Sequence, residues 1–522
     1  MSWLDYDREP GKWDDVPESY TAQEAGLAAE AAKLPPFTPF SARADAEIAT
    51  IPAPVEYLTI DGLQYKRDVN GTALTTGDGA TWAPVGTISP RHFGAAGDGV
   101  TDDTAAFNAA LEFIRDAVDV ATEQRPVTLY GGRNVYLIAG SINATGISAG
   151  RGWTFRDVFI KATGQDKTVV DFTGSRFLNL DNVSVRTMGQ SDTSLRPWCG
   201  ILLANSDTTP CAHITMNNVS VDGYFKGAAL QNCSAEEVDA TKCLFWNRAV
   251  ASGGVLPTDP DYAPAYAAIF DGRARLPIKS DYATQSVGRT SFTMNNFVGC
   301  AFQKPFGIAG PTVYMSDLAS SNFEKPYMTA GSDVVIEWLL FDDFSPYAIT
   351  FDGMQVETTG VKGAFSFLPQ SAAAQFIYGL KIRFGNAFCE EDILRVGNAA
   401  AVVVLRDFEL AIDRFASGVT PLNGVIGTRS LFALGNANLV MPDESMFGLL
   451  GDYGALTGQV YCIAQNSRRT YGVENMLDGA VITERLTLST LPVYADNAAA
   501  VTGGLANGRV YKTVTGELRI VI

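Results

Sequence analysis

A four-residue pattern recurs along the middle of the chain: an apolar residue, any residue, an Asp or Asn, and a second apolar residue. Full copies stand at 155–158, 180–183, 216–219, 294–297, 315–318 and 405–408, and looser ones at 240–243 and 351–354. Several steps are short: 155 to 180 (25), 216 to 240 (24) and 294 to 315 (21). The longer steps fit a structural repeat of roughly 22 to 25 residues that carries insertions.

The pattern has a physical explanation in stacked coils. Both apolar residues point inward, and the Asp or Asn between them tolerates the left-handed backbone that a sharp bend needs. Stacking then places like residues above like. The strands are short and no helices separate them, which favours a solenoid over a sheet with helical crossovers. The sequence therefore predicts an all-β fold built mainly as a parallel β-helix.

A glycine-rich motif and a helix precede the repeat. Residues 93–107 read FGAAGDGVTDDTAAF, and Thr101 or Asp102 can cap a helix. Apolar residues then recur on one helical face: Phe107, Ala110, Leu111, Ile114 and Val118. We expect a capping helix over 102–119. The glycine spacing does not match a dinucleotide-binding fingerprint.

The flanking regions predict three smaller parts. Residues 1–50 form an arm with one helix, and 51–88 form a small hairpin unit that precedes the β-helix of 89–420. Residues 421–522 form a small C-terminal β region for trimerisation or receptor contact. Trp3 and Trp13 lie in an arm with no core of its own. They are either incidental aromatics in a disordered tail or an anchor that packs against another protein.

Composition narrows the partners and the compartment. The net charge of −18 argues against binding to nucleic acid or an anionic membrane. The seven cysteines, without any CxxC, predict buried reduced thiols and folding in a reducing cytoplasm. The polar, acidic N-terminus predicts no signal peptide. No run of 18 apolar residues exists, so we expect no membrane insertion.

At 93–107 the sequence resembles the opening of pectate-lyase-like β-helix proteins, and among these phage tailspikes and tail-associated depolymerases. The stretches 77–82 and 491–511 are similar to a linker and a C-terminal module of phage tail proteins, whereas 130–133 departs from the family's usual turn. The resemblance implies a right-handed β-helix and a homotrimer of parallel chains. It also implies a place in the virion tail, with the arm bound to other tail proteins.

The candidate metal-binding and catalytic residues are considered by residue type and spacing. Only two histidines are present, both better explained as structural, and no carboxylates have convincing calcium spacing, so we expect no metal and no cofactor. Two-carboxylate glycoside hydrolysis is the remaining enzymatic option, with polysaccharide lyase chemistry as its rival. The catalytic candidates lie on insertions in the repeat, and they are Asp271, Glu324 and Asp342.

Substrate-binding candidates come from the same insertions, because tyrosine and tryptophan stack on sugars and arginine binds hydroxyls or acidic groups. They are Tyr262, Tyr266, Arg273, Trp198 and Trp338. Residues 341–344 match the repeat themselves, so Asp342 could equally be a turn residue, and Trp338 lies in an apolar run typical of a core. The insertion at 249–290 binds glycan or packs against a neighbouring subunit.

Three functions stay open. The first is a tailspike-type receptor-binding protein that binds, and in one version depolymerises, a host surface polysaccharide. The second is a non-enzymatic structural or adaptor tail protein. The third is a cellular polysaccharide lyase or hydrolase, against which the expected lack of a signal peptide and the aromatic arm both count.

Overall fold

The computed structural model describes most of the chain between residues 38 and 412 and shorter stretches beyond. The described residues are 38–51, 55–120, 127–164, 167–188, 196–206, 208–248, 266–272, 294–305, 310–329, 334–341, 343–357, 363–369, 375–388, 392–396, 403–412, 420–423, 425–426, 429–430, 432–435, 437–441, 455–456, 459–464, 470–474, 493–504, 510–512 and 518–520. The predicted arm helix and the anchor residues Trp3 and Trp13 lie outside them.

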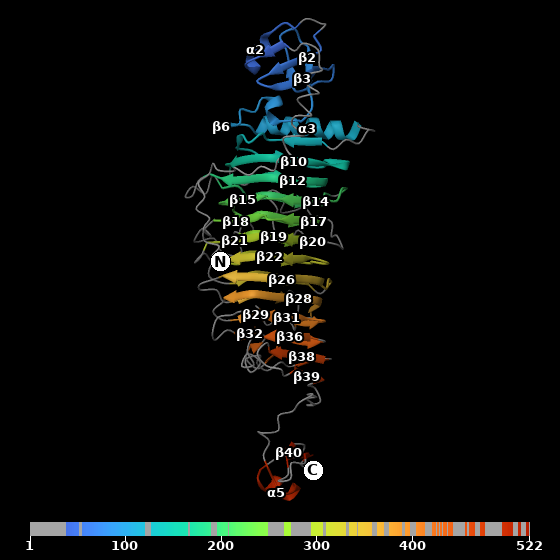
Figure 1. Cartoon of the computed structure of the whole chain (residues 1–522), viewed down its shortest axis with the longest axis vertical. Helices are drawn as coiled ribbons and strands as arrows, with labels where there is room; N and C mark the ends of the chain where they lie inside the picture. Colours follow the sequence, from blue (N-terminus) through green and yellow to red (C-terminus); the bar gives the residue numbers. More distant parts are fainter. Residues whose placement is uncertain are drawn as a thin grey trace, which may run out of the picture.

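A small β unit forms the N-terminal end of the described structure (Figure 1). Its sheet has the strands β1 (Thr38–Phe40), β2 (Tyr57–Ile60), β3 (Leu63–Arg67), β5 (Thr81–Pro84) and β4 (Leu74–Thr75), with helix α2 (Arg43–Ile48) beside them. The turn at Asp61-Gly62 joins β2 to β3 as an antiparallel hairpin, as the sequence predicts. The boundary predicted at residue 50 is wrong, because β1 pairs with β2 and belongs to this unit.

A short 3-10 helix, η1 (Pro90–Phe93), connects the small unit to the rest of the chain. Its carbonyl at His92 accepts hydrogen bonds from the Arg43 guanidinium (2.6 Å) and the Tyr65 hydroxyl (3.2 Å). The His92 ring is buried, and its Nδ1 accepts a hydrogen bond from the Ser89 amide at 3.0 Å. Phe93 packs against both hydrophobic cores. The junction is therefore a packed contact between the two parts.

The predicted capping helix is α3 (Thr104–Val120), within two residues of the expected bounds. Its inward face is buried against the first coil, and Phe107 meets Tyr136 edge to face at 4.7 Å between ring centroids. The glycine motif before it is fixed by Asp103, whose carboxylate accepts hydrogen bonds from the amides of Ala96 and Gly97. The helix thus covers the open end of the apolar interior.

Beyond α3 the chain folds as a right-handed parallel β-helix, which confirms the predicted fold class (Figure 1). Its long sheet bends once in every coil, and this bend divides it into a first and a second half. The long sheet contains β6 (Asp98–Asp102), β7 (Val127–Tyr130), β8 (Val135–Ile138), β10 (Ser148–Ala162), β12 (Arg176–Thr187), β14 (Ala212–Asn217), β15 (Ser220–Gly223), β17 (Glu236–Thr241), β18 (Leu244–Asn247), β20 (Asn295–Val298), β21 (Ala301–Gln303), β23 (Asn322–Glu324), β24 (Tyr327–Thr329), β26 (Tyr347–Glu357), β28 (Gln375–Phe388), β30 (Val403–Arg406), β31 (Glu409–Ile412), β35 (Phe432–Gly435), β36 (Ala437–Met441), β37 (Ala455–Leu456), β38 (Gln459–Ala464) and β39 (Thr470–Glu474).

A second sheet of ten strands closes the coil opposite the bend. Its strands are β9 (Ile142–Asn143), β11 (Thr168–Asp171), β13 (Cys199–Ala204), β16 (Ala228–Cys233), β19 (Tyr266–Asp271), β22 (Val313–Ser316), β25 (Val334–Leu340), β27 (Gly363–Pro369), β29 (Asp392–Val396) and β32 (Thr420–Asn423). Every residue of β16 and β19 is buried, so both faces of this sheet are covered there. Such strands lack the alternation of apolar and polar residues that marks a half-exposed strand.

The bend of the long sheet is the structural origin of the repeat. The third residue of the pattern has a left-handed backbone in coil after coil, with φ from 49° at Lys325 to 66° at Gly353. The other bend residues are Asp157, Asn182, Asn218, Lys242 and Gly299. The copies at 155, 180, 216, 240 and 351 are thereby confirmed. Their flanking apolar residues are buried in one continuous core.

Three copies of the pattern do not mark this bend where the sequence predicts it. At 294–297 the bend falls at Gly299, because Phe297 and Cys300 are the residues that point inward. At 315–318 the left-handed residue Asp317 follows β22, so it turns the chain at a different corner. At 405–408 the residue before Asp407 pairs with Tyr378, and Tyr378 pairs with Tyr347, so Asp407 also lies at another corner, before the bend at Gly353. The predicted end of the β-helix at 420 is also too early, since β36 and β38 still pair in parallel up to Ala464.

The C-terminal region contains further short elements. These are the antiparallel pairs β33 (Val425–Ile426) with β34 (Arg429–Ser430) and β40 (Val510–Lys512) with β41 (Leu518–Ile520), and helix α5 (Asn497–Thr502). Asp496 caps α5 by accepting a hydrogen bond from the Ala499 amide at 2.8 Å. The predicted small C-terminal β region therefore has β structure at 510–512 and 518–520, while its role stays a prediction.

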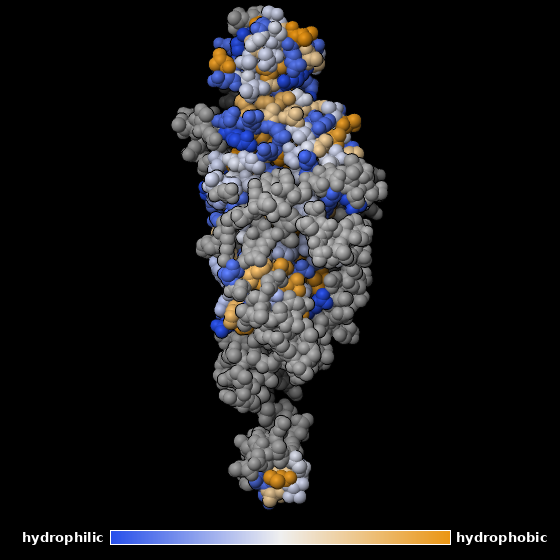
Figure 2. Space-filling view, turned by 180° about the vertical axis from the view of Figure 1, so that it is seen from behind, coloured by the Kyte–Doolittle hydropathy of each residue, from blue (hydrophilic) through white to orange (hydrophobic). Residues whose placement is uncertain are grey.

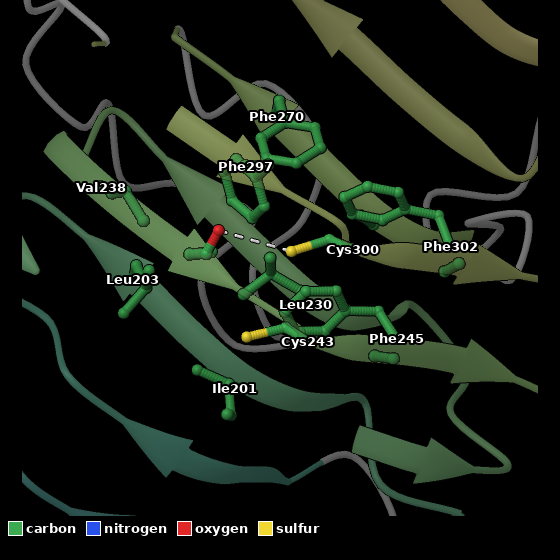
Figure 3. Close-up of a cluster of buried hydrophobic side chains, with 14 of the residues drawn as sticks. Ile201, Leu203, Leu230, Val238, Cys243, Phe245, Phe270, Phe297, Cys300 and Phe302 are labelled. Carbon is green, nitrogen blue, oxygen red and sulfur yellow. Dashed lines mark hydrogen bonds between the residues drawn. The ribbon is translucent and has the colours of Figure 1, made fainter. Parts of the chain in front are cut away.

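Aromatic rings stack along the interior of the β-helix. Phe297, Phe323 and Phe351 belong to successive coils, with ring centroids 5.6 Å and 4.7 Å apart. Figure 3 shows Phe245, Phe270 and Phe302 pointing into the same interior, together with Cys243 and Cys300. The five cysteines whose side chains are described are buried thiols outside any disulfide, as the sequence predicts: Cys199, Cys211, Cys233, Cys243 and Cys300.

We predict that the junction makes stability depend on pH. Burial lowers the pKa of His92 from its usual 6.5 to about 4. Above pH 6.5 the ring is neutral in both states, and as pH falls from 6.5 through 4 the unfolded chain alone gains the proton. The free energy of unfolding should therefore fall by roughly 3 kcal/mol across this window. Urea unfolding between pH 4 and 7.5 measures this free energy. The variant His92→Gln should show a smaller dependence of stability on pH than the wild type. An equal dependence in the two proteins would contradict the assignment to His92.

A second prediction concerns the aromatic stack. Phe323→Ala removes the middle ring of three and leaves a cavity, so it should lower the free energy of unfolding by about 3–5 kcal/mol. The exposed Phe388 on β28 provides the matched control, and Phe388→Ala should change stability by less than about 1 kcal/mol. Chemical denaturation of both variants measures the difference. Equal losses would mean that the stack does not determine stability.

Candidate functional site

The outer face of the long sheet displays side chains in straight columns, because successive coils pair in register. We call this surface, made of the outward side chains of β10 to β28, the outer face. One column of its first half contains Arg156, Asp181, Asn217, Thr241, Val298, Glu324 and Asp352. Neighbouring strands are about 4.8 Å apart, so each side chain stands directly beside its counterparts above and below.

Two carboxylates face each other at the lower end of this column. Glu324 on β23 and Asp352 on β26 are direct partners in the parallel pairing. Their inward neighbours Phe323 and Phe351 are buried, so both carboxylates point to the outside. Lys325 contributes one cation, with its Nζ 3.4 Å from Glu324 Oε1. Like charges directly opposite destabilise a sheet, and this pair is therefore a feature that folding alone does not favour.

A tyrosine lies beside this acidic pair on the second half of the sheet. The hydroxyl of Tyr327 donates a hydrogen bond to Glu357 Oε2 at 3.0 Å. Burial raises the pKa of Tyr327 to about 12, and the hydrogen bond and charge of Glu357 act in the same direction. The phenol therefore stays a donor at every physiological pH and holds the Glu357 carboxylate in place.

An amide ladder runs along the neighbouring column. Asn296 Nδ2 donates to Asp239 Oδ1 at 3.0 Å, and Asn322 Nδ2 donates to Asn296 Oδ1 at 2.9 Å. A side-chain amide has two N–H donors and two lone pairs, so each ladder bond occupies only part of its capacity. The ladder fixes the orientation of these amides next to Glu324 and Asp352. Such a surface can form hydrogen bonds with the hydroxyl groups of a long polymer.

Trp246 on β18 provides an aromatic side chain higher on the second half. The Arg248 guanidinium lies 3.9 Å from its ring centroid and donates two hydrogen bonds to Asp222, at 2.7 Å and 2.8 Å. Fork-like pairs of this kind have fixed geometry. The indole, the guanidinium and the carboxylate therefore form one rigid group on the outer face.

The structure places four predicted site residues away from the outer face. Asp271 and Tyr266 belong to the fully buried strand β19; Ser316 Oγ donates to Asp271 Oδ1 at 2.7 Å, and Tyr266 packs against Tyr314. Trp198 is buried beside β13. Trp338 lies in the interior next to Phe367, at 5.8 Å between ring centroids. Their burial contradicts direct contact with a glycan.

Glu324 is the predicted catalytic residue that does lie on the outer face. Asp342, Tyr262 and Arg273 lie outside the described residues, so their predicted roles stay predictions. Sequence reasoning missed the pairing of Glu324 with Asp352. The second position of the repeat points outward, and this could have revealed the pair. Glu324 holds that position in Phe323–Pro326, and Asp352 holds it in Phe351–Met354.

Within the described ranges, no group of three or more His, Cys, Asp or Glu side chains is arranged to hold a metal ion. Both histidines have structural contacts: His92 in the junction, and His213 stacked on Phe177 at 4.6 Å and paired with Glu237. In the described part of the chain, no helix is long and apolar enough to cross a membrane. Figure 2 shows hydrophilic and hydrophobic side chains interspersed on the surface of the small unit.

No family model and no curated protein sequence matches the chain. Among solved structures it is similar to the gp42 tailspike of an Acinetobacter phage, with a TM-score of 0.47 and 10% identity over 91% of this chain and 82% of that one. PfbA, a surface adhesin of Streptococcus pneumoniae, gives a TM-score of 0.44 and 10% identity over 77% of this chain and 99% of its own. An exopolygalacturonase from Thermotoga maritima gives 0.35 and 10% over 77% and 96%. Tailspikes and pectate-lyase-like proteins are thus among the structures that this chain is similar to, as the glycine motif predicts.

Proposed function

We propose that the protein is a tailspike-type receptor-binding protein whose outer face binds a host cell-surface polysaccharide. An extended polymer needs a long, shallow and rigid surface more than a deep pocket. The long sheet provides such a surface, with side chains in register from coil to coil. Trp246 and Tyr327 add aromatic groups of the kind that stack on sugar rings.

The observation that carries the proposal is the register pairing of Glu324 and Asp352. Two like charges on adjacent strands lower stability, and a charged ligand group or a polar sugar can offset that repulsion. The amide ladder at Asn296 and Asn322 lies on the same coils. Carboxylates, amides and a tyrosine within three coils match the hydroxyl-rich surface of a glycan better than that of an apolar partner.

Depolymerisation is the enzymatic version of this proposal. Glycoside hydrolysis uses two carboxylic groups, one as acid and one as base or nucleophile. Glu324 and Asp352 would take these roles, with Tyr327 positioning the nearby Glu357. The non-enzymatic version uses the same face for binding alone. Two alternatives from the sequence remain. An adaptor tail protein would need no glycan-binding face. A cellular lyase or hydrolase would not belong to a virion.

The proposal also includes the assembly that the sequence resemblance implies. Three parallel chains would form a homotrimer on the virion tail, with the segment before Thr38 attached to other tail proteins. Protein faces that are covered in a trimer would not bind glycan, so the outer face must remain accessible between the chains. The C-terminal region after the β-helix would hold the chains together.

Our third prediction tests the acidic pair. Glu324→Gln and Asp352→Asn each remove one of two opposed charges without changing shape, so both variants should unfold at equal or higher denaturant concentration. Glycan binding should weaken by about tenfold or more, and any depolymerisation should fall at least a hundredfold. Sedimentation with purified surface polysaccharide and the chain length of the product measure these effects.

The control is Glu56→Gln, an identical change at an exposed position of the small unit. It should leave binding and cleavage unchanged. Unaltered binding by both outer-face variants would refute the proposed site. Lost binding with retained polymer length in the wild type would favour the non-enzymatic version.

Our fourth prediction concerns assembly. Native mass spectrometry of the full chain should give three times the monomer mass of 55.8 kDa. The trimer should persist in Glu324→Gln, because that residue is proposed to face the ligand and not another chain. A monomer in the wild type would contradict the assembly, and a monomer only in the variant would show that Glu324 lies in a subunit interface.

A further inference from the structure

A second pair of like charges stands on the outer face, at the opposite end from the acidic pair. Lys161 on β10 and Arg186 on β12 are direct partners in the parallel pairing. Their neighbours Ile160 and Val185 are buried, so both cationic side chains point outward. Two cations in register destabilise the sheet, in a chain whose net charge of −18 gives it many acidic residues.

The local contacts leave the positive charge of this pair only partly compensated. The Lys161 ammonium donates to the Gly99 carbonyl at 3.2 Å, which is a neutral acceptor. Arg186 is exposed and makes no ion pair with any residue in the described ranges. Asp222 is its partner on the next coil, but both oxygens of that carboxylate accept hydrogen bonds from Arg248. The cationic pair therefore presents charge to the outside.

The same column continues into the aromatic group. Asp222 pairs with Trp246, and the Arg248 guanidinium lies over the indole. From Lys161 to Trp246 the column takes three steps of about 4.8 Å each. Two partly compensated cations and the Trp246 side chain thus lie along roughly 15 Å of one straight line. This arrangement suits a chain of sugars that carries negative charge.

We propose that this end of the outer face, defined by Lys161, Arg186 and Trp246, binds the anionic groups of the polysaccharide. The inference rests on the proposed function and names its ligand class: a glycan with carboxylate or phosphate substituents. The acidic pair lies on the first half of the sheet, with Glu324 four coils below Arg186, about 20 Å along the axis. The acidic pair repels the anionic groups that the cationic pair attracts. Together the two pairs favour one placement of an anionic polymer along the sheet.

The test uses an array of purified bacterial capsular and O-chain polysaccharides, each in native, carboxyl-reduced and dephosphorylated form. The full-length wild type should bind anionic members, and the treatment that removes the charge should weaken binding by about tenfold. Arg186→Glu should weaken binding to the native polymer roughly three- to tenfold, and Arg186→Gln by less. The carboxyl-reduced and dephosphorylated arms separate the two sources of charge.

A matched control and a second measurement keep the result decisive. Lys66→Glu makes the same charge change at an exposed position of the small unit and should leave binding unchanged. Arg186→Gln should raise the unfolding midpoint or leave it unchanged, because it relieves repulsion from Lys161. A lower midpoint would show that Arg186 has a structural role, and would overturn the inference.

The remaining outcomes also decide between the two proposals. Wild-type binding to neutral members alone would overturn this inference while the proposed function stands. Wild-type binding to no member would reject the proposed function itself, and the inference with it. Equal losses in Arg186→Glu and Lys66→Glu would show a general effect of net charge, which also contradicts a site at Arg186.

Discussion

In-register stacking of the coils at the bend is the interaction on which the rest of the structure depends. Each coil contributes a buried residue on either side of a left-handed position, and the next coil repeats it directly below. The interior then gains a column of rings such as Phe297, Phe323 and Phe351. Amide ladders form outside for the same reason, as at Asn182 and Asn218, where Asn218 Nδ2 donates to Asn182 Oδ1 at 3.1 Å. A shift of one residue would expose every buried ring.

The same constraint shapes the outer face. Register that stacks apolar residues inside also fixes which outward side chains meet, so some charged residues have a like-charged partner on the next coil. Lys161 with Arg186 and Glu324 with Asp352 are two such pairs. Both lower the stability of the sheet in isolation, and a ligand can offset the repulsion. Binding groups on this scaffold are therefore rigid before the ligand arrives, which limits the entropy lost on binding.

The β-helix could be predicted from the sequence because its bend demands particular residue types. Asp157, Asn182 and Asn218 stand where only a few residues tolerate a left-handed backbone, and the apolar residues beside them repeat. Prediction failed where the pattern does not apply: Lys325 takes the same left-handed conformation without an Asp or Asn, and Gly299 displaced the expected bend. Insertions change the spacing, so register could not be counted across them.

The site was harder to predict. Whether a charged side chain points inward or outward, and which residue lies beside it, depends on the register between coils and not only on the residues next to it in the sequence. Glu324 was named for its place in an insertion, yet its importance comes from Asp352 in the next coil. Asp271 and Trp338 were named by the same reasoning and prove to be buried, Asp271 in a strand covered on both faces and Trp338 in the interior core. Polar residues in such strands look like loop residues when only the sequence is known.

The most direct test of the account is a structure of the full-length protein with a bound surface oligosaccharide, obtained by crystallography or electron cryomicroscopy. The account predicts that the sugar chain runs along the outer face across successive coils, with an acidic group near Arg186 and neutral sugars near Glu324 and Asp352. A sugar chain bound on the ten-stranded sheet or on the C-terminal region, with the outer face empty, would contradict it.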